Sequence, residues 1–317
     1  MDIGFDARTP GAVSDPGERI QLVTEGEALG YDYTTVSDHL VTPTTLRATY
    51  PYATDGVFPA VASGGRHEQL TAIAFLAAKT TTLRFVTSVM VVPYRPPILT
   101  AKVMSTIDVL SGGRLTVGAG TGWMEDEFEV LDLPPFAERG RVTDEYLEAM
   151  KALWTEENPS YDGKYVRFSD IKFEPKPQQK PHPPVWIGGL SGPAMRRAAR
   201  LGDAWYPVPN DAAKPLDSLA RLRAGIAKMR ALTEAAGRDP DSVAVAMRVH
   251  HYGPALPPEA GDGERRLFSG GPEEVAADLR ALRDLGLIAV DFRFAYDTTD
   301  EALTRMESFQ RDVVAKI

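Results

Sequence analysis

The strongest constraint on the fold is a strand-helix-strand pattern between Leu83 and Phe128. Two apolar runs rich in β-branched residues, Leu83–Val92 and Leu115–Ala119, flank a segment with helical periodicity. Both runs are almost continuously apolar, which is typical of parallel strands covered on both faces. Small polar residues mark their ends, Thr87-Ser88 in the first and Gly120-Thr121-Gly122 after the second. Ligands of α/β folds bind at such strand ends.

The same alternation recurs along the whole chain, with eight expected strands and eight expected helices. The strands are expected at residues 2–6, 33–36, 83–92, 115–119, 185–189, 203–208, 243–249 and 287–294. In 317 residues this count predicts a single (β/α)8 TIM barrel domain over residues 1–317, rather than a doubly wound open sheet. No G-x-G-x-x-G follows the first strand, which counts against a Rossmann fold.

A proline-rich stretch, residues 156–184, interrupts the alternation after the fourth expected helix at residues 144–154. Apolar and polar residues alternate around Val166 and Phe168, so a small β-hairpin is possible there. We interpret the stretch as an insertion into the barrel.

Composition excludes several classes of protein. The net charge is −9 and there is no cluster of Lys or Arg, which argues against a nucleic-acid partner. The chain has no Cys, so disulfides, thiolate metal sites and cysteine nucleophiles are excluded, and no metal site is predicted. No eighteen consecutive residues are apolar, and the chain opens directly into a strand. We therefore expect a cytoplasmic protein with no membrane partner.

Unusual residues gather at four of the expected strand ends. They are Asp38 and His39 after the second strand, Ser88 and Val89 late in the third, Thr121 and Trp123 after the fourth, and Gly188, Gly189 and Ser191 after the fifth. Each has an ordinary structural role available, such as a turn for Asp38 or a loop contact for His39. One shared pocket on the carboxyl rim, where barrels carry their chemistry, explains all of them together. The two glycines also precede a helix, where bare backbone N–H groups favour a phosphate.

The connection from Leu40 to Arg66 is rich in proline and aromatic residues. Loops of this length in compact domains are usually functional lids or disordered segments. Its aromatic residues Tyr50, Tyr52 and Phe58 favour a lid that walls the substrate together with Trp123.

Several motifs carry a resemblance over essentially the whole chain: SDHL, TSVMVVPYRPP, LSGGRLTVGAGTGWMEDEF, the PxPxQxPxPPVWIGG stretch and GDAWYP. The chain resembles the luciferase-like monooxygenase superfamily, and within it the branch that uses the deazaflavin coenzyme F420. This resemblance implies a coenzyme across the carboxyl rim, in contact with Asp38, His39, Ser88, Val89, Thr121, Gly188 and Gly189, with Ser191 beside the last two. It also implies a non-prolyl cis peptide bond at Ser88-Val89.

The sequence departs from the sugar-phosphate dehydrogenases of that branch at Trp123. Those enzymes have Glu directly after the matching Thr-Gly, so a carboxylate that acts in proton transfer is absent at this position. A reductase, alcohol dehydrogenase or monooxygenase activity on a small organic substrate is then expected. His39 would be the catalytic acid/base, and Asp38 would orient the polar tail of the coenzyme.

Two alternatives stay open. One is an FMN-dependent monooxygenase on the same fold, in which reduced flavin reacts with oxygen. The other is a non-catalytic flavin or ligand carrier that has kept the barrel and lost turnover. Members of the family are commonly dimeric, so a homodimer is expected.

Overall fold

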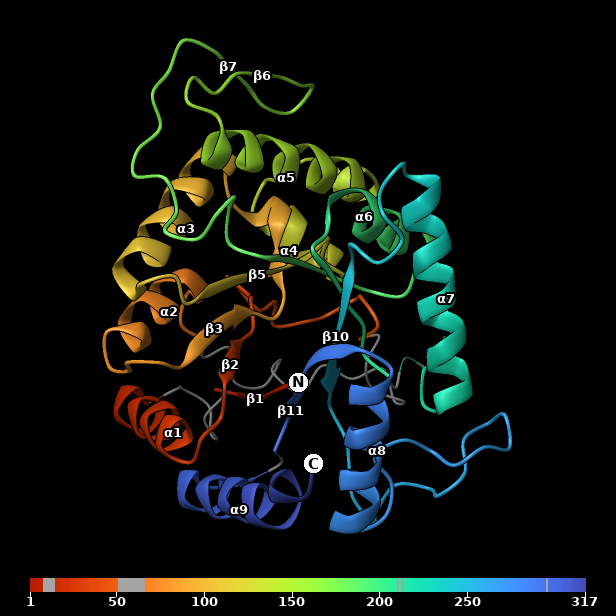
Figure 1. The fold of residues 1–317 in the computed structure, drawn as a ribbon. Helices are drawn as coiled ribbons and strands as arrows, with labels where there is room; N and C mark the ends of the chain where they lie inside the picture. Colours follow the sequence, from red (N-terminus) through yellow and green to blue (C-terminus); the bar gives the residue numbers. More distant parts are fainter. Residues whose placement is uncertain (8–14, 51–65, 210, 212–213, 295) are drawn as a thin grey trace. The chain divides into compact units, whose positions relative to one another are not determined.

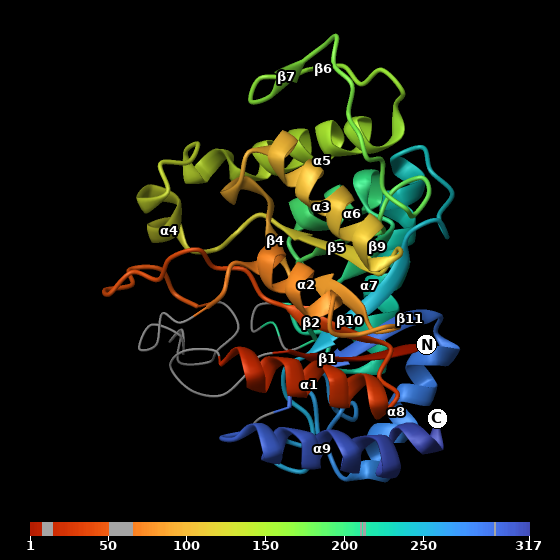
Figure 2. The ribbon, with the colours of Figure 1, turned by 90° about the vertical axis from the view of Figure 1, so that its left-hand side faces the viewer.

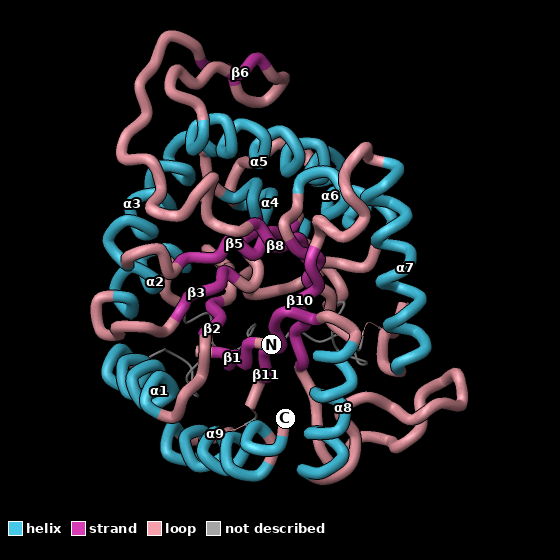
Figure 3. Tube along the Cα trace, in the orientation of Figure 1, coloured by secondary structure: helices cyan, strands magenta, loops and turns pink. Residues whose placement is uncertain are grey.

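The computed structural model describes residues 1–7, 15–50, 66–209, 211, 214–294 and 296–317. Strands and helices alternate along these residues (Figure 3). The strands are β1 (Asp2–Asp6), β2 (Tyr33–Val36), β3 (Arg84–Thr87), β4 (Met90–Val91), β5 (Leu115–Gly120), β6 (Tyr161–Asp162), β7 (Arg167–Phe168), β8 (Val185–Gly188), β9 (Ala204–Tyr206), β10 (Ala244–Val249) and β11 (Leu287–Phe292). The α-helices are α1 (Pro16–Ala28), α2 (Gln69–Ala77), α3 (Pro97–Ser111), α4 (Glu125–Val130), α5 (Arg139–Thr155), α6 (Gly192–Leu201), α7 (Leu219–Ala235), α8 (Pro272–Asp284) and α9 (Thr299–Asp312). Short 3-10 helices are η2 (Val92–Tyr94), η3 (Phe136–Glu138) and η4 (Val314–Lys316).

One sheet contains every described strand except β6 and β7, in the order β3-β2-β1-β11-β10-β9-β8-β5-β4. β3 also pairs with β5, so the sheet closes on itself. β3 and β4 together form one interrupted strand, so eight strands alternate with helices over the described residues. The chain is a (β/α)8 barrel, as the sequence predicted.

Two compact units are distinguishable within the chain, one of residues 1–35 and 187–317, the other of residues 36–186. Their boundaries fall inside β2 and β8. The expectation of a single domain over residues 1–317 stays a prediction. Among the helices of the described residues, none is long and apolar enough to cross a membrane.

In the unit of residues 36–186, α3 and α5 pack against each other on one side of β3 and β5 (Figures 1 and 2). Trp154 of α5 is buried and its Nε1 donates to the carbonyl oxygen of Ala101 in α3 at 3.0 Å. α3 begins at Pro97 and ends before Gly112, whose φ of 72° lies in the left-handed region. Proline in the first turn and glycine after the last are the expected helix boundaries.

The structure corrects the predicted strand at residues 83–92. β3 ends at Thr87, β4 begins at Met90, and the peptide bond between Ser88 and Val89 is cis, which confirms that expectation. Both pieces pair in parallel with β5, Phe85 opposite Leu115 and Met90 opposite Ala119. An almost continuously apolar run does not reveal such a break, because apolar residues on both sides of it suit a buried strand.

Two helices differ from the prediction. α4 was not predicted, since six residues are too few to show a helical period. α5 begins at Arg139 rather than near residue 144, and its added turn buries Val142 and Thr143. The predicted hairpin is confirmed as β6 and β7, with Tyr161 opposite Phe168, and the insertion that contains it follows α5.

In the unit of residues 1–35 and 187–317, β11 pairs in parallel with both β1 and β10. The buried guanidinium of Arg248 in β10 lies among charged and hydroxyl groups of neighbouring strands. Its Nη2 donates to Asp6 Oδ2 at 2.7 Å, and its Nη1 donates to Asp291 Oδ2 at 3.2 Å and to Thr35 Oγ1 at 2.7 Å. The hydroxyl of Tyr206 donates to the other oxygen of Asp291. We call Arg248, Asp6 and Asp291 the buried ion cluster.

Candidate active site

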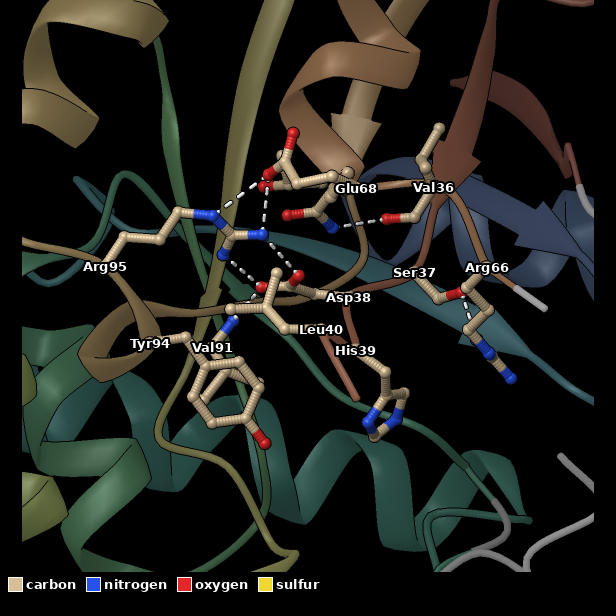
Figure 4. A network of polar contacts seen from close by, with 12 residues as sticks. Val36, Ser37, Asp38, His39, Leu40, Arg66, Glu68, Val91, Tyr94 and Arg95 are labelled. Atoms are coloured by element: carbon tan, nitrogen blue, oxygen red, sulfur yellow. Dashed lines mark hydrogen bonds and ion pairs between the residues drawn. The ribbon is translucent and has the colours of Figure 1, made fainter. Parts of the chain in front are cut away.

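Asp38, directly after β2, is buried and faces the protein rather than solvent (Figure 4). Its two carboxylate oxygens accept hydrogen bonds from Arg95 Nη1 and Nη2, both at 2.8 Å. The backbone N–H of Val91 also donates to Oδ2 at 3.0 Å. The side chain thus ties the end of β2 to β4. A contact between Asp38 and a coenzyme stays a prediction.

Arg95 joins Asp38 to Glu68, the residue before α2 (Figure 4). Its Nη2 lies 2.7 Å from Glu68 Oε1, and Glu68 also accepts from the backbone N–H of Thr71. Burial opposes ionisation of Glu68, but the Thr71 hydrogen bonds and the charge of Arg95 lower its pKa. Residues 38 and 68 are therefore held together by one guanidinium, which we call the Arg95 clamp.

His39 contacts a carboxylate that the sequence did not point to, that of Glu127 in α4. The His39 Nδ1 lies 2.7 Å from Glu127 Oε2, and the hydroxyl of Tyr94 donates to the same oxygen at 2.7 Å. The backbone N–H groups of Leu40 and Val41 donate to Oε1 at 2.7 and 3.2 Å. Glu127 is completely buried, whereas the side chain of His39 is 10% exposed.

The environment of Glu127 favours its ionised form. Burial acts to raise its pKa, but hydrogen bonds from His39, Tyr94 and Val41 act against burial, and the net direction is downward. Burial and the charge of Glu127 raise the pKa of Tyr94, so its hydroxyl stays protonated and donates. The carboxylate of Glu127 is therefore an acceptor with several donors aimed at it.

An aromatic wall lies beside His39. The ring of Trp123 meets the imidazole edge-on with centroids 6.2 Å apart, and Tyr50 lies 5.2 Å from Trp123. Both rings and Leu46 pack against the buried side chain of Met124. Trp123 thus lies next to His39, and Tyr50 lies next to Trp123; their role in walling a substrate stays a prediction. Tyr52 and Phe58, predicted for the same wall, lie outside the described residues.

The segment after His39 is anchored to α4 at a second carboxylate. Asp126 accepts from Arg47 Nε at 2.6 Å and from the backbone N–H groups of Arg47 and Ala48 at 3.3 and 3.2 Å. Asp126 is buried, so both acidic residues in the middle of α4 bind the connection that follows β2.

In this unit Ser88 and Val89 lie between β3 and β4, and Thr121 directly follows the neighbouring strand β5. The backbone N–H of Ser88 donates to the Val36 carbonyl at 2.8 Å, which places the cis bond beside the end of β2. In β5, a Cβ at Gly120 would come within 2.6 Å of Val89 Cγ2, so glycine permits the close approach of the two strands. The structure therefore brings Ser88 and Val89 next to the strand end that carries Asp38 and His39.

Gly188, Gly189 and Ser191 belong to the other compact unit, at the carboxyl end of β8. Gly189 has a φ of 105°, a conformation that residues with a side chain rarely adopt. Ser191 caps α6, since its Oγ accepts from the Ala194 N–H at 3.2 Å. The predicted glycine turn before a helix is present, and the hydroxyl of Ser191 serves that helix.

Sequence reasoning missed Glu127, Tyr94 and Arg95. The run Glu125-Asp126-Glu127 after the glycines carried a usable signal, because acidic residues favour the first turn of a helix. No carboxylate is present at Trp123, but that of Glu127, four residues later, lies against the imidazole of His39.

The family profile described as luciferase-like monooxygenase matches residues 3–253. An uncharacterized protein of Mycobacterium tuberculosis is 31% identical over 308 residues, 96% of this chain and 98% of that protein. An FMNH2-dependent dimethylsulfone monooxygenase of Pseudomonas putida is 38% identical over 143 residues, 44% of this chain and 39% of that protein. Among solved structures, an F420-dependent secondary alcohol dehydrogenase in complex with an F420-acetone adduct has a TM-score of 0.75 at 16% identity, covering 100% of this chain and 99% of that chain.

Proposed function

Because the chain belongs to the luciferase-like monooxygenase family, we propose that it is an oxidoreductase that moves a hydride between coenzyme F420 and a small organic substrate. The observation that carries the proposal is His39, held by a buried carboxylate beside the aromatic wall of Trp123 and Tyr50. A positioned imidazole next to a wall of rings can exchange a proton with a substrate while water is kept away.

The residues of each unit fit a coenzyme of this class. Before α6, Gly188 and Gly189 leave backbone uncovered at a helix N-terminus, and a Cβ at Gly189 would meet Ala194 Cβ at 3.1 Å. That donor set suits the phosphate of a coenzyme tail. At residue 89 a half-buried valine side chain suits the flat face of a ring system.

When bound, the coenzyme would supply or accept the hydride. His39 would accept the proton that a substrate hydroxyl loses as its carbon is oxidised to a carbonyl, and would return it in the reverse direction. Trp123 and Tyr50 would orient the substrate and exclude water. Glu127 would hold the imidazole in place.

A second candidate is an FMN-dependent monooxygenase, which the 38% identity to the dimethylsulfone monooxygenase favours over that part of the chain. His39 would then exchange a proton with the substrate, and the coenzyme would be reduced FMN. The two candidates share the site and differ in the coenzyme that it selects.

We expect the purified protein to bind F420 more tightly than FMN, because Ser37-Asp38-His39 matches the segment that contacts the deazaflavin in that branch of the family. Fluorescence titrations with oxidised and reduced forms of each coenzyme, at one ionic strength, measure the two affinities. Equal or tighter binding of FMN would replace F420 by FMN as the proposed coenzyme. Binding of both without turnover of alcohols, ketones or sulfones would support a carrier.

The Gly188→Val variant tests whether the phosphate of the coenzyme binds at the N-terminus of α6. An isopropyl group before α6 would block approach of a phosphate to the backbone N–H groups, so affinity for the preferred coenzyme should fall while the thermal midpoint changes little. The matched variant Gly261→Val lies in the connection between β10 and α8, where an added Cβ would come no closer than 3.4 Å, to the side chain of Arg221. If Gly188→Val binds as well as the parent protein, the phosphate is held elsewhere.

We also propose a homodimer. In the unit of residues 36–186, α3 exposes four large apolar side chains, and α2 adds Phe75. Leu99 is 59% exposed and Leu110, eleven residues later and hence on the same helix face, is 80% exposed. Light scattering should give twice the mass of 34.6 kDa, and the double variant Leu99→Glu, Leu110→Glu should lower it. A parent protein with the mass of one chain at all concentrations contradicts this proposal.

A further inference from the structure

We infer that Glu127 is a positioning residue that holds the His39 imidazole as its Nδ1–H tautomer, so that Nε2 is the nitrogen that exchanges a proton with the substrate. The inference rests on the proposed function of His39. It adds a specific proton position and a residue that sets it.

The hydrogen bonds of Glu127 decide which nitrogen carries the proton. An ionised carboxylate can only accept, and Glu127 Oε2 lies 2.7 Å from His39 Nδ1, so Nδ1 must be the donor. In the neutral imidazole only one nitrogen carries hydrogen, and the lone pair is then on Nε2. Glu127 is kept ionised by its other donors, which lower its pKa against the opposing effect of burial.

The orientation of the Glu127 carboxyl group is fixed from its far side. The backbone N–H groups of Leu40 and Val41 both point at Oε1, and backbone N–H groups cannot accept a hydrogen bond. Whatever occupies the Oε1 position must therefore be an acceptor. The Oε2 position, which faces His39 and the hydroxyl of Tyr94, is where chemistry can be altered without breaking the backbone contacts.

Glutamine at position 127 tests the inference, because its amide has one oxygen that accepts and one nitrogen that donates. In Glu127→Gln the amide oxygen must take the Oε1 position, because Leu40 and Val41 donate to it. The amide NH2 group then faces Nδ1 and can only donate. His39 Nδ1 becomes an acceptor and the imidazole proton moves to Nε2, which is the opposite tautomer. The Tyr94 hydroxyl can rotate to accept from the second amide hydrogen, so the variant keeps its packing.

Nitrogen-15 NMR of the full chain labelled in histidine, at a pH where the imidazole is neutral, reads the tautomer directly. The His39 signals are assigned by their loss in His39→Ala. We expect Nδ1–H in the parent protein, Nε2–H in Glu127→Gln, and Nδ1–H in the matched control Glu129→Gln. Glu129 is on the same helix but is exposed and bonds Arg47.

An Nε2–H tautomer in the parent protein, or an unchanged tautomer in Glu127→Gln, would overturn the inference. The measurement on the parent protein decides the tautomer even where the variant fails to fold, and Tyr94→Phe, which leaves the His39 contact intact, should keep Nδ1–H. The readout needs neither coenzyme nor turnover. If the tautomers are as expected but His39→Ala retains its rate, the proposed function of His39 fails while its positioning by Glu127 stands.

Discussion

Replacing His39 with alanine should lower turnover with the preferred coenzyme about 10²- to 10⁴-fold, the usual contribution of a positioned acid or base. Coenzyme affinity should change far less, since a lost neutral hydrogen bond is worth only about 0.5 to 1.5 kcal/mol. The fold should persist, because Glu127 keeps the donors Tyr94, Leu40 and Val41 when the imidazole is removed. Steady-state kinetics and coenzyme titration on one preparation measure both quantities.

His182→Ala is the matched control for this experiment. His182 lies in the insertion, and its ring packs near Trp154 instead of the aromatic wall. Its removal should leave the rate within about twofold of the parent protein. A rate for His39→Ala that equals that of the control would assign the imidazole a structural role and leave the chemistry to the coenzyme.

The second large effect concerns the buried ion cluster. Arg248→Met should lower the free energy of unfolding by about 3 to 5 kcal/mol at pH 8, because it leaves the carboxylates of Asp6 and Asp291 buried without their cation. The matched variant Arg230→Met removes an exposed ion pair with Asp241 and should cost at most about 1 kcal/mol. Urea denaturation of the three proteins measures the difference.

The pH dependence of that loss has a definite sign. Burial raises the pKa of Asp291 to about 6, although Arg248 acts to lower it. In the unfolded chain Asp titrates near 3.9, so between about pH 4 and pH 6 the folded state binds more protons and stability falls as the pH rises. Removing Arg248 extends this fall above pH 6. The deficit of Arg248→Met should therefore be larger at pH 8 than at pH 5, and an equal deficit at both would contradict the account.

The barrel could be predicted from the sequence because most of its strands are runs of apolar residues. Runs such as Leu115–Ala119 and Leu287–Phe294 are apolar for the reason that parallel strands are covered on both faces. The prediction was wrong where a run conceals a break in the strand, as between β3 and β4. The resemblance, rather than the pattern of residues, indicated the cis bond in that break.

The site was predictable only in part. His39, Trp123 and Tyr50 were expected together, because His39 and Trp123 follow expected strands and Tyr50 lies in the connection after β2. The ring of Trp123 lies beside both of the others. Glu127 could not be found by the same rule, because it comes from a six-residue helix whose position depends on Met124 and Phe128 packing beneath it. Polar residues that act through other residues leave no periodic signal in the sequence.

The Arg95 clamp also has a consequence for how such an enzyme can diversify. Residues 47 and 48 are bound to Asp126, and Glu68 is bound to Arg95, so both ends of the stretch between residues 49 and 67 are fixed by contacts outside it. Insertions, deletions and exchanges there leave the contact between His39 and Glu127 untouched, because both residues lie outside the stretch. Selection can therefore change this stretch for the molecules it recognises while the proton-exchanging group is inherited unchanged.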